Sequence, residues 1–243
     1  MHSRSTVSAV LELVGEGHNS CEISRRTGVP RSTVRGWRQG QVPKRTPRVC
    51  DLCAGRPPQL PEPEYAYLLG LYLGDGCISP HPRTYRMRIV LDSMYPRIIE
   101  DCAVSLRAVC PEKSPWVGAH GRGCVAVSMY WNHWPCLFPQ HGSGKKHLRP
   151  IVLSPWQCTL VERNRRQLIR GLIHSDGCRV VANDRGLMSV RYHFSNLSSD
   201  IKQIYCDSLD ALGIRWTRPC DREIAVYRKS AVAVMDQFVG PKE

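Results

Sequence analysis

Leu68–Gly76 reads LLGLYLGDG, and a second copy of this pattern, IRGLIHSDG, occupies Ile169–Gly177. Each copy is a mostly apolar run that carries two small residues four positions apart and ends in Asp-Gly. The small residues are Gly70 and Gly74 in the first copy and Gly171 and Ser175 in the second. Small residues at this spacing let two helix backbones cross closely, and a glycine after such a run is typical of a helix end. The two copies therefore predict a pair of closely packed helices.

Such a helix pair would bring Asp75 and Asp176, which are 101 residues apart in the chain, together at one end. A carboxylate is unfavourable at a helix C-terminus, where the helix dipole is already negative, so two of them there require a cation. Mg²⁺ prefers carboxylate oxygens together with waters and phosphates. The sequence therefore predicts two or more Mg²⁺ ions between Asp75 and Asp176, with the backbone carbonyls of Gly74 and Ser175 as further ligands.

The order of elements after the first motif is repeated after the second, which indicates a tandem duplication. Residues 84–92 and 188–196 alternate between polar and apolar side chains, as half-buried strands do, and each run precedes an amphipathic helix, at 96–109 and 201–212. Further strands are predicted at 121–130 and 224–228, and further helices at 131–138 and 230–239. The offset between the halves is about 103 residues in these elements, which aligns Arg88 with Arg191.

One face of each alternating strand is polar and basic. Because an antiparallel sheet can bury one face and present the other, these side chains are predicted to contact nucleic acid. They are Thr84, Arg86 and Arg88 in the first half and Ser189, Arg191 and His193 in the second. The segment 139–150 interleaves glycines with Lys145, Lys146 and other basic residues. It is either a loop laid on a phosphate backbone or a basic linker, and both place the two lysines near DNA.

Gly, Leu, Asp and Gly fall in register in the two motifs. The pattern resembles the LAGLIDADG homing endonuclease family, in its form with two motifs in one chain, over residues 64–240. The resemblance implies an α+β fold of two pseudo-symmetric αββαββα repeats whose strands form a saddle over double-stranded DNA. It also implies a monomer with internal pseudo-two-fold symmetry. The implied activity is site-specific, metal-dependent hydrolysis of DNA phosphodiester bonds, in which Asp75 and Asp176 are catalytic.

Members of this family place a basic residue and a polar, water-organising residue near each scissile phosphate. Lys229, at the end of a predicted strand, is the positional match for the basic residue in the second half. The equivalent point in the first half is Tyr130 or Trp131, so Lys145 or Lys146 must serve there or that half lacks the residue. Gln140 and Ser189 are the candidate water-organising residues.

The charge of the chain points to a polyanionic partner. Its 243 residues carry a formal net charge of +13, and 42% of them are apolar, which is enough for a buried core. The sequence contains no run of eighteen apolar residues and no hydrophobic segment of a signal peptide near Met1. We therefore expect a cytoplasmic protein with no membrane partner. Most of the twelve cysteines lie in apolar runs, so they are expected to be small core residues, not a disulfide framework.

Residues 5–38 predict a compact unit of three helices. The spacing of Ile23, Gly28, Val29, Val34 and Trp37 is typical of a helix-turn-helix, with Gly28 in the turn and the recognition helix at 31–38. Side chains on that helix are of the types that contact bases or phosphates; they are Arg31, Ser32, Thr33, Arg35 and Arg38. The alternative interpretation is a helical hairpin with a solvated basic face.

A proline-rich tether follows the helical unit and contains Cys50 and Cys53. A Cys-x-x-Cys pair is half of a Zn²⁺ site, but no second pair follows at the expected spacing, so reduced thiols or the remnant of a lost zinc ribbon are the alternatives. The expected domain organisation is a helix-turn-helix at 1–40, the tether at 41–63, a first LAGLIDADG half at 64–150 and a second half at 151–243.

Three functions remain open from the sequence. A DNA endonuclease needs both aspartates, and both are present. A transcription regulator that keeps the LAGLIDADG fold without cleavage would explain the attached helix-turn-helix. An intron-binding RNA maturase would use the same surface. The target sequence, the cut positions and the role of the helix-turn-helix in specificity or autoregulation do not follow from the sequence.

Overall fold

A computed structural model describes residues 4–42, 51–52, 54, 56, 58–184 and 186–242. The chain divides into two compact units, Met1–Val49 and Cys50–Glu243. Cys50 and Cys53, the candidate zinc ligands, lie outside the described residues. Among the described helices, none combines the length and the apolar character that crossing a bilayer requires.

The first unit contains the three expected helices, α1 (Arg4–Gly15), α2 (Ser20–Thr27) and α3 (Arg31–Arg38). Asn19 caps the start of α2, because its side-chain oxygen accepts hydrogen bonds from the Cys21 and Glu22 amides at 3.0 Å each. Gly28 ends α2 in the left-handed conformation, with φ of 68°. The small core of this unit consists of Val10, Ile23, Val29, Val34 and Trp37. Capping and core spacing thus form the two helices and the turn where the sequence predicts them.

The second unit consists of two halves with the same order of elements, which confirms the α+β prediction. The first half contains α4 (Glu62–Asp75), β1 (Gly76–His81), β2 (Thr84–Asp92), α5 (Pro96–Val109), β3 (Trp116–Gly121), β4 (Cys124–Trp131) and α6 (Trp134–Leu137). The second half contains α8 (Arg165–Asp176), β5 (Gly177–Asp184), β6 (Leu187–Ser195), α9 (Ser199–Ala211), β7 (Thr217–Cys220), β8 (Glu223–Val226) and α10 (Lys229–Asp236). Between them lie η1 (Lys146–Leu148) and α7 (Pro155–Arg163).

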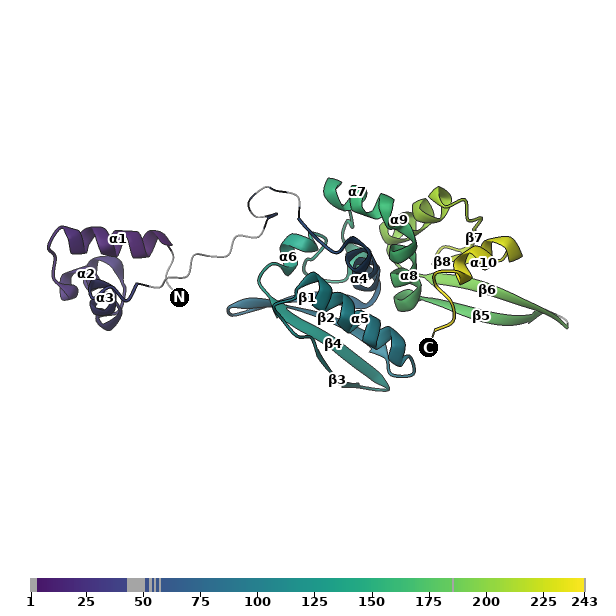
Figure 1. The fold of residues 1–243 in the computed structure, drawn as a ribbon, viewed down its shortest axis with the longest axis horizontal. Coiled ribbons are helices and arrows are strands. Elements are labelled where there is room, and N and C mark those ends of the chain that lie inside the picture. The colour runs from purple at the N-terminus through teal and green to yellow at the C-terminus, as the bar shows by residue number, and fades with distance from the viewer. Residues whose placement is uncertain are drawn as a thin grey trace. The chain divides into compact units, whose positions relative to one another are not determined.

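Each half builds one four-stranded antiparallel sheet, with strand orders β1-β2-β4-β3 and β5-β6-β8-β7. The helices α4 and α8 lie side by side at the centre of the second unit, with one sheet on either side of them (Figure 1). The apolar residues of the central strands, such as Met87, Ile89, Tyr192 and Phe194, are buried. The alternation seen in the sequence therefore turns one face of each sheet to the core and leaves the other for a partner.

The close crossing of α4 and α8 depends on glycines. A Cβ atom placed on Gly70 would lie 2.5 Å from the Leu168 carbonyl oxygen, and one placed on Gly171 would lie 2.2 Å from the Tyr67 carbonyl oxygen. A side chain at either position would therefore collide with the backbone of the facing helix. The expected role of the small residues is confirmed: they allow the two helix backbones to touch and so bring the helix ends together.

The predicted strand at 121–130 is wrong at its start, because that region is a turn followed by a strand. Arg122 and Gly123 have positive φ values of 52° and 71°, as does Gly121 at the end of β3, with 86°. They form the connection between β3 and β4, and β3 itself was not predicted. The turn is decided by two glycines around one arginine, a pattern that favours left-handed backbone.

The alignment of Arg88 with Arg191 is also corrected by the strand register. Arg86 pairs with Ser79, and Arg191 pairs with Val180; each partner is the third residue after the glycine that ends its motif. Arg86 is therefore the structural equivalent of Arg191, and Arg88 is equivalent to His193. The cause is the longer hairpin of the second half, since β5 has eight residues where β1 has six.

Candidate active site and nucleic-acid interface

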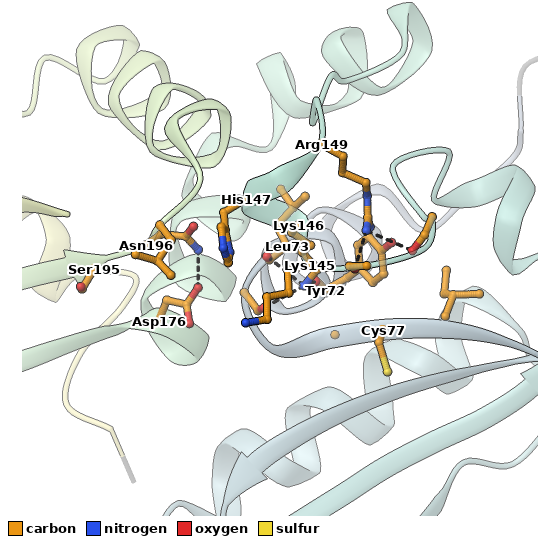
Figure 2. A pocket seen from close by; sticks show the side chains of 16 residues that line it. Tyr72, Leu73, Cys77, Lys145, Lys146, His147, Arg149, Asp176, Ser195 and Asn196 are labelled. Atoms are coloured by element: carbon orange, nitrogen blue, oxygen red, sulfur yellow. Dashed lines mark hydrogen bonds between the residues drawn. The ribbon is translucent and has the colours of Figure 1, made fainter. Parts of the chain in front are cut away.

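The ends of the two motif helices border a cavity of about 430 Å³. Its lining comes from three regions: the end of α4 with the start of β1, the segment between the halves, and Asp176 with residues 195–197. Figure 2 shows Asp176 and Asn196 on one side of the cavity and Lys146 with the end of α4 on the other. The cavity therefore brings together groups that are far apart in the sequence.

Asp75 and Asp176 are brought together as expected, in an environment that opposes their ionisation. Burial, and then the negative charge of Asp176, raise the pKa of Asp75 to about 6. Burial also raises the pKa of Asp176, although the Asn196 side-chain amide donates a hydrogen bond of 2.5 Å to its Oδ2 atom and works in the opposite direction. Asp75 is exposed and Asp176 is half-buried, and two neighbouring carboxylates with raised pKa values form a site for positive charge.

Lys146 supplies part of that positive charge. Its ammonium group donates hydrogen bonds to the carbonyl oxygens of Tyr72, Leu73 and Gly74, at 2.5, 3.0 and 2.7 Å, and so caps the end of α4. Burial lowers the pKa of Lys146 to about 8, while Asp176 and Asp75 act to raise it. The Gly74 carbonyl, a predicted metal ligand, keeps one lone pair beyond this bond.

Lys242 is the counterpart of Lys146 at the other helix, and the sequence reasoning missed it. Its Nζ atom donates a hydrogen bond of 3.0 Å to the carbonyl oxygen of His174, near the end of α8. Burial lowers the pKa of Lys242, whereas Asp75 and Asp176 act to raise it. Each motif helix thus meets a lysine from the segment that follows its own half. The duplication could have identified Lys242 from the sequence, because a lysine that follows the first half predicts an equivalent lysine after the second half.

The predicted catalytic and metal-binding residues are not all gathered at the cavity, because its lining includes Gly74 and Asp176 but neither Asp75 nor Ser175. Lys145 is exposed and lines it, beside Lys146. Lys229 is exposed at the first position of α10, and it is absent from the lining residues of this cavity. The Ser175 hydroxyl donates to the carbonyl oxygens of Gly171 and Leu172, at 3.1 and 3.0 Å, so it stays within its own helix.

Gln140, a candidate water-organising residue, lies in the core instead. Its Nε2 atom donates hydrogen bonds to the Val152 carbonyl at 2.9 Å and to Gln157 Oε1 at 2.6 Å. Gln157 in turn donates to the Tyr65 hydroxyl at 2.7 Å. This buried network fixes the segment between the halves against α4 and α7. Ser189, the other candidate, lies on β6, where its hydroxyl accepts a hydrogen bond of 3.1 Å from Arg191 Nε.

The predicted nucleic-acid contacts lie on the faces that the sequence assigns to them. On β2 and β6 they are half-buried, on the side opposite the core residues; they are Thr84, Arg86, Arg88, Ser189, Arg191 and His193. On α3 the residues Arg31, Ser32, Arg35 and Arg38 are exposed and Thr33 is half-buried. The Nδ1 atom of His193 also contacts the carboxylate of Glu223, which the sequence did not indicate.

The donor set at the helix ends fits a hard divalent cation. Asp75 and Asp176 offer carboxylate oxygens, and the end of α4 adds carbonyl oxygens, which are the ligand types that Mg²⁺, Mn²⁺ and Ca²⁺ accept. Within the part of the chain that the structure describes, no group of three or more His, Cys, Asp or Glu side chains is arranged to hold a metal ion. Waters or phosphate oxygens must therefore complete the coordination of any ion at this site.

We expect the stability of the metal-free protein to fall as the pH rises past the pKa of Asp75. Its folded-state pKa of about 6 exceeds the ordinary value of an aspartate, 3.8, so the folded protein binds the proton more tightly. The stabilisation is fully present below the lower value and is lost as the pH rises through 6, and solvent screening reduces its size because Asp75 is exposed. Urea unfolding in EDTA between pH 4 and 8 gives the free energy of unfolding of wild type and of Asp75→Asn. The loss is the change with pH in the difference between these two free energies. Parallel curves for the two proteins would contradict it.

No family model matches the sequence, and no curated protein matches it. Solved structures do resemble it. Mesophilic variants of the homing endonuclease I-DmoI are 16% identical, with 73% of this chain and 96% of that chain covered and a TM-score of 0.49. The LAGLIDADG meganuclease I-AabMI bound to uncleaved DNA is 14% identical, with 72% and 82% covered and a TM-score of 0.45. Full-length DUF199/WhiA from Thermatoga maritima is 13% identical, with 75% and 56% covered and a TM-score of 0.50.

The likeness to full-length DUF199/WhiA agrees with the features of the chain itself. Two glycine-bearing helices cross at the centre, each leads from its aspartate directly into the first strand of an antiparallel sheet, and the two halves repeat one topology. The second unit of this chain therefore has the LAGLIDADG fold, with both motifs in one chain.

Proposed function

We propose that this protein is a site-specific endonuclease that binds double-stranded DNA and hydrolyses it with a divalent cation, as a monomer with internal pseudo-symmetry. The observation that carries the proposal is the pair of carboxylates, one from each half, that meet at the crossing of α4 and α8 and whose pKa values are raised there. A purely structural role does not account for placing two repelling charges together. The I-DmoI and I-AabMI structures described with bound DNA are relatives of the same fold.

In this proposal Asp75 and Asp176 hold the cation, with the carbonyl oxygens of Gly74 and Ser175 as neighbouring donors. A bound divalent cation polarises the phosphoryl oxygen and lowers the pKa of a water molecule. Lys146 and Lys242 place positive charge beside the reacting phosphates. We assign the basic role in the second half to Lys242 in preference to Lys229, because both aspartates act on the pKa of Lys242. Lys145 contacts the DNA backbone from the rim of the cavity.

The sheets and α3 provide the DNA-binding surface. The half-buried polar faces of β2 and β6 contact the duplex, and α3 acts as the recognition helix of a helix-turn-helix. The net charge of +13 supplies the long-range attraction. Neutralisation of phosphates makes the logarithm of the affinity fall with the logarithm of the salt concentration, by about 0.9 for each phosphate contacted. A shallow salt dependence would count against this surface.

Selection of duplexes from a random library tests the proposal. Full-length protein is used to enrich bound duplexes in Ca²⁺, and the winners are then incubated with the protein in Mg²⁺ or Mn²⁺. We expect double-strand breaks at one defined position within the selected sequence. Specific binding without any break in either metal would refute the endonuclease, and failure to enrich any sequence would refute specific DNA binding as well.

A non-cleaving DNA-binding regulator is the second candidate. The observation in its favour is the separate three-helix unit, whose α3 exposes three arginines, since an additional DNA-reading unit is not needed for cleavage. For this function the aspartates would serve only the packing of the helix ends. The same selection experiment separates the two candidates, because a regulator yields bound sequences that stay intact in Mg²⁺.

Replacing Lys146 by methionine is expected to slow cleavage by about a hundredfold, the usual effect of removing one preorganised electrostatic contact at a reacting group. Methionine keeps the length of the side chain but lacks the charge that faces Asp75, Asp176 and the end of α4. Single-turnover rates in Mg²⁺ and dissociation constants in Ca²⁺ separate the chemical step from binding. Lys145→Met is the matched control, since it removes the neighbouring exposed charge. Equal rates for the two variants would show that the position of Lys146 is unimportant.

A further inference from the structure

The two sheets contain the same arginine arrangement at equivalent positions. In the strand register, Arg86 on β2 pairs with Ser79 and Arg191 on β6 pairs with Val180. Each of these partners is the third residue after the glycine that ends its motif. The pseudo-two-fold relation of the halves therefore superposes these two arginines on each other. Both lie on the polar face of their sheet, because Met87 and Tyr192, their neighbours in the chain, are buried on the other side.

Each guanidinium group lies over a tyrosine ring and is bonded to a serine hydroxyl. The guanidinium carbon of Arg86 lies 5.7 Å from the ring centre of Tyr130, and that of Arg191 lies 5.2 Å from the ring centre of Tyr227. Each arginine also donates a hydrogen bond of 3.1 Å to a serine hydroxyl. The donor atoms are Arg86 Nη2 to Ser128 and Arg191 Nε to Ser189. The two serines come from non-equivalent places, β4 and β6, so the halves reach one arrangement by different substitutions.

An arginine fixed in this way is suited to reading a base. Stacking on the ring and the bond to serine hold the guanidinium, so little side-chain entropy remains to be lost on binding. A planar fork held on a polar sheet face matches the N7 and O6 acceptors that guanine presents in the major groove. A contact to phosphate alone does not need this order, since a flexible lysine provides it. The tyrosines remain 45% and 38% exposed, so these arrangements lie at the surface.

The neighbouring positions differ between the halves. The equivalent of Arg88 is His193, and His193 is paired with the carboxylate of Glu223. The indole of Trp116 also lies 6.0 Å from the Arg86 guanidinium carbon. The two sheets therefore share one reading position and differ around it.

We propose that Arg86 and Arg191 each read a guanine, at two positions of the target that are symmetric about its centre, within an otherwise asymmetric sequence. This inference rests on the proposed DNA-binding function and adds two specificity-determining residues to it. Tyr130 and Tyr227 act as positioning residues that hold the two guanidinium groups in the plane of the base.

The experiment is a selection of bound duplexes in Ca²⁺ with wild type, Arg86→Ala and Arg191→Ala. With wild type, we expect guanine at two positions equally far from the centre of the site. Changing either guanine to adenine should weaken wild-type binding by about 5- to 150-fold, the range for loss of one bidentate contact. Arg86→Ala should lose the preference at one of these positions only, and Arg191→Ala at the other.

Further variants separate the loss of guanine recognition from misfolding and from the loss of a positive charge. Arg86→Lys retains the charge but lacks the fork, so it should lose the guanine preference as Arg86→Ala does. Tyr130→Phe keeps the ring and should keep the preference, whereas Tyr130→Ala should weaken it. Arg107→Ala removes an exposed arginine from α5, which lies on the core side of its sheet, and should leave the preference unchanged.

The outcomes separate this inference from the function on which it rests. Sequence-specific binding without guanine at symmetric positions would overturn the inference alone. Equal weakening of all sequences by Arg86→Ala or Arg191→Ala would also overturn it, because the arginines would then contact only phosphate. Failure to bind any duplex would overturn the proposed function, and the inference with it.

Discussion

Replacing Asp75 and Asp176 by asparagine is expected to abolish DNA cleavage while the duplex is still bound. Asparagine has nearly the same shape but is neutral, so the cation loses both charged ligands. Several kcal/mol of electrostatic stabilisation disappear with it, which corresponds to a fall of about a thousandfold or more in rate. Single-turnover cleavage in Mg²⁺, compared with affinity in Ca²⁺-free buffer, measures the two effects separately.

The same variants should be more stable than the wild type in EDTA at pH 7. Desolvation raises the pKa of both aspartates, and the charge of Asp176 raises that of Asp75 further, so their ionised forms are unfavourable in the folded protein. A higher unfolding midpoint together with lost cleavage would be the signature of residues kept for function at a cost in stability. Asn196→Ala is a suitable comparison, because it removes the hydrogen bond to Asp176 and leaves both carboxylates. A double variant that cuts at the wild-type rate would exclude these aspartates as metal ligands.

Gly171→Ala is expected to have the largest effect on stability, a loss of about 3 kcal/mol or more. The added methyl group would lie 2.2 Å from the Tyr67 carbonyl oxygen and 3.0 Å from the Gly70 Cα atom. Both are backbone atoms that cannot rotate away, so α4 and α8 must separate. The gain in helix propensity from glycine to alanine is only about 1 kcal/mol and does not compensate. Denaturant unfolding measures the loss.

A matched control exists one turn further along the same pair of helices. A methyl group on Gly74 would meet the Ser175 side chain, at 2.1 Å from Oγ and 2.5 Å from Cβ. The single variant Gly74→Ala should therefore be destabilised, and the addition of Ser175→Gly should restore much of the stability. No such exchange relieves Gly171→Ala, because its obstacle is backbone. Wild-type stability for Gly171→Ala would show that the helices do not cross as closely as described.

Much of the fold was predictable because it depends on local patterns. Glycines at a four-residue spacing predict the close crossing of α4 and α8, and the alternation along β2 and β6 predicts which face of each sheet is buried. Asn19 and Gly28 mark the ends of α2 from their own backbone preferences. These signals lie within a few residues of the structure they produce, so the sequence alone determined most of the elements, but not β3, and also the duplication and the meeting of Asp75 with Asp176.

Only the tertiary structure decided how the two halves correspond and which cations reach the aspartates. The longer β5–β6 hairpin shifts the register and makes Arg86, not Arg88, the equivalent of Arg191. Lys146 and Lys242 reach the helix ends from segments without periodic pattern, and Lys146 lies more than 70 residues from the carbonyls that it binds. Strand register depends on pairing across the sheet, and such loop contacts depend on where the chain returns in space. Neither is encoded in the spacing of neighbouring residues.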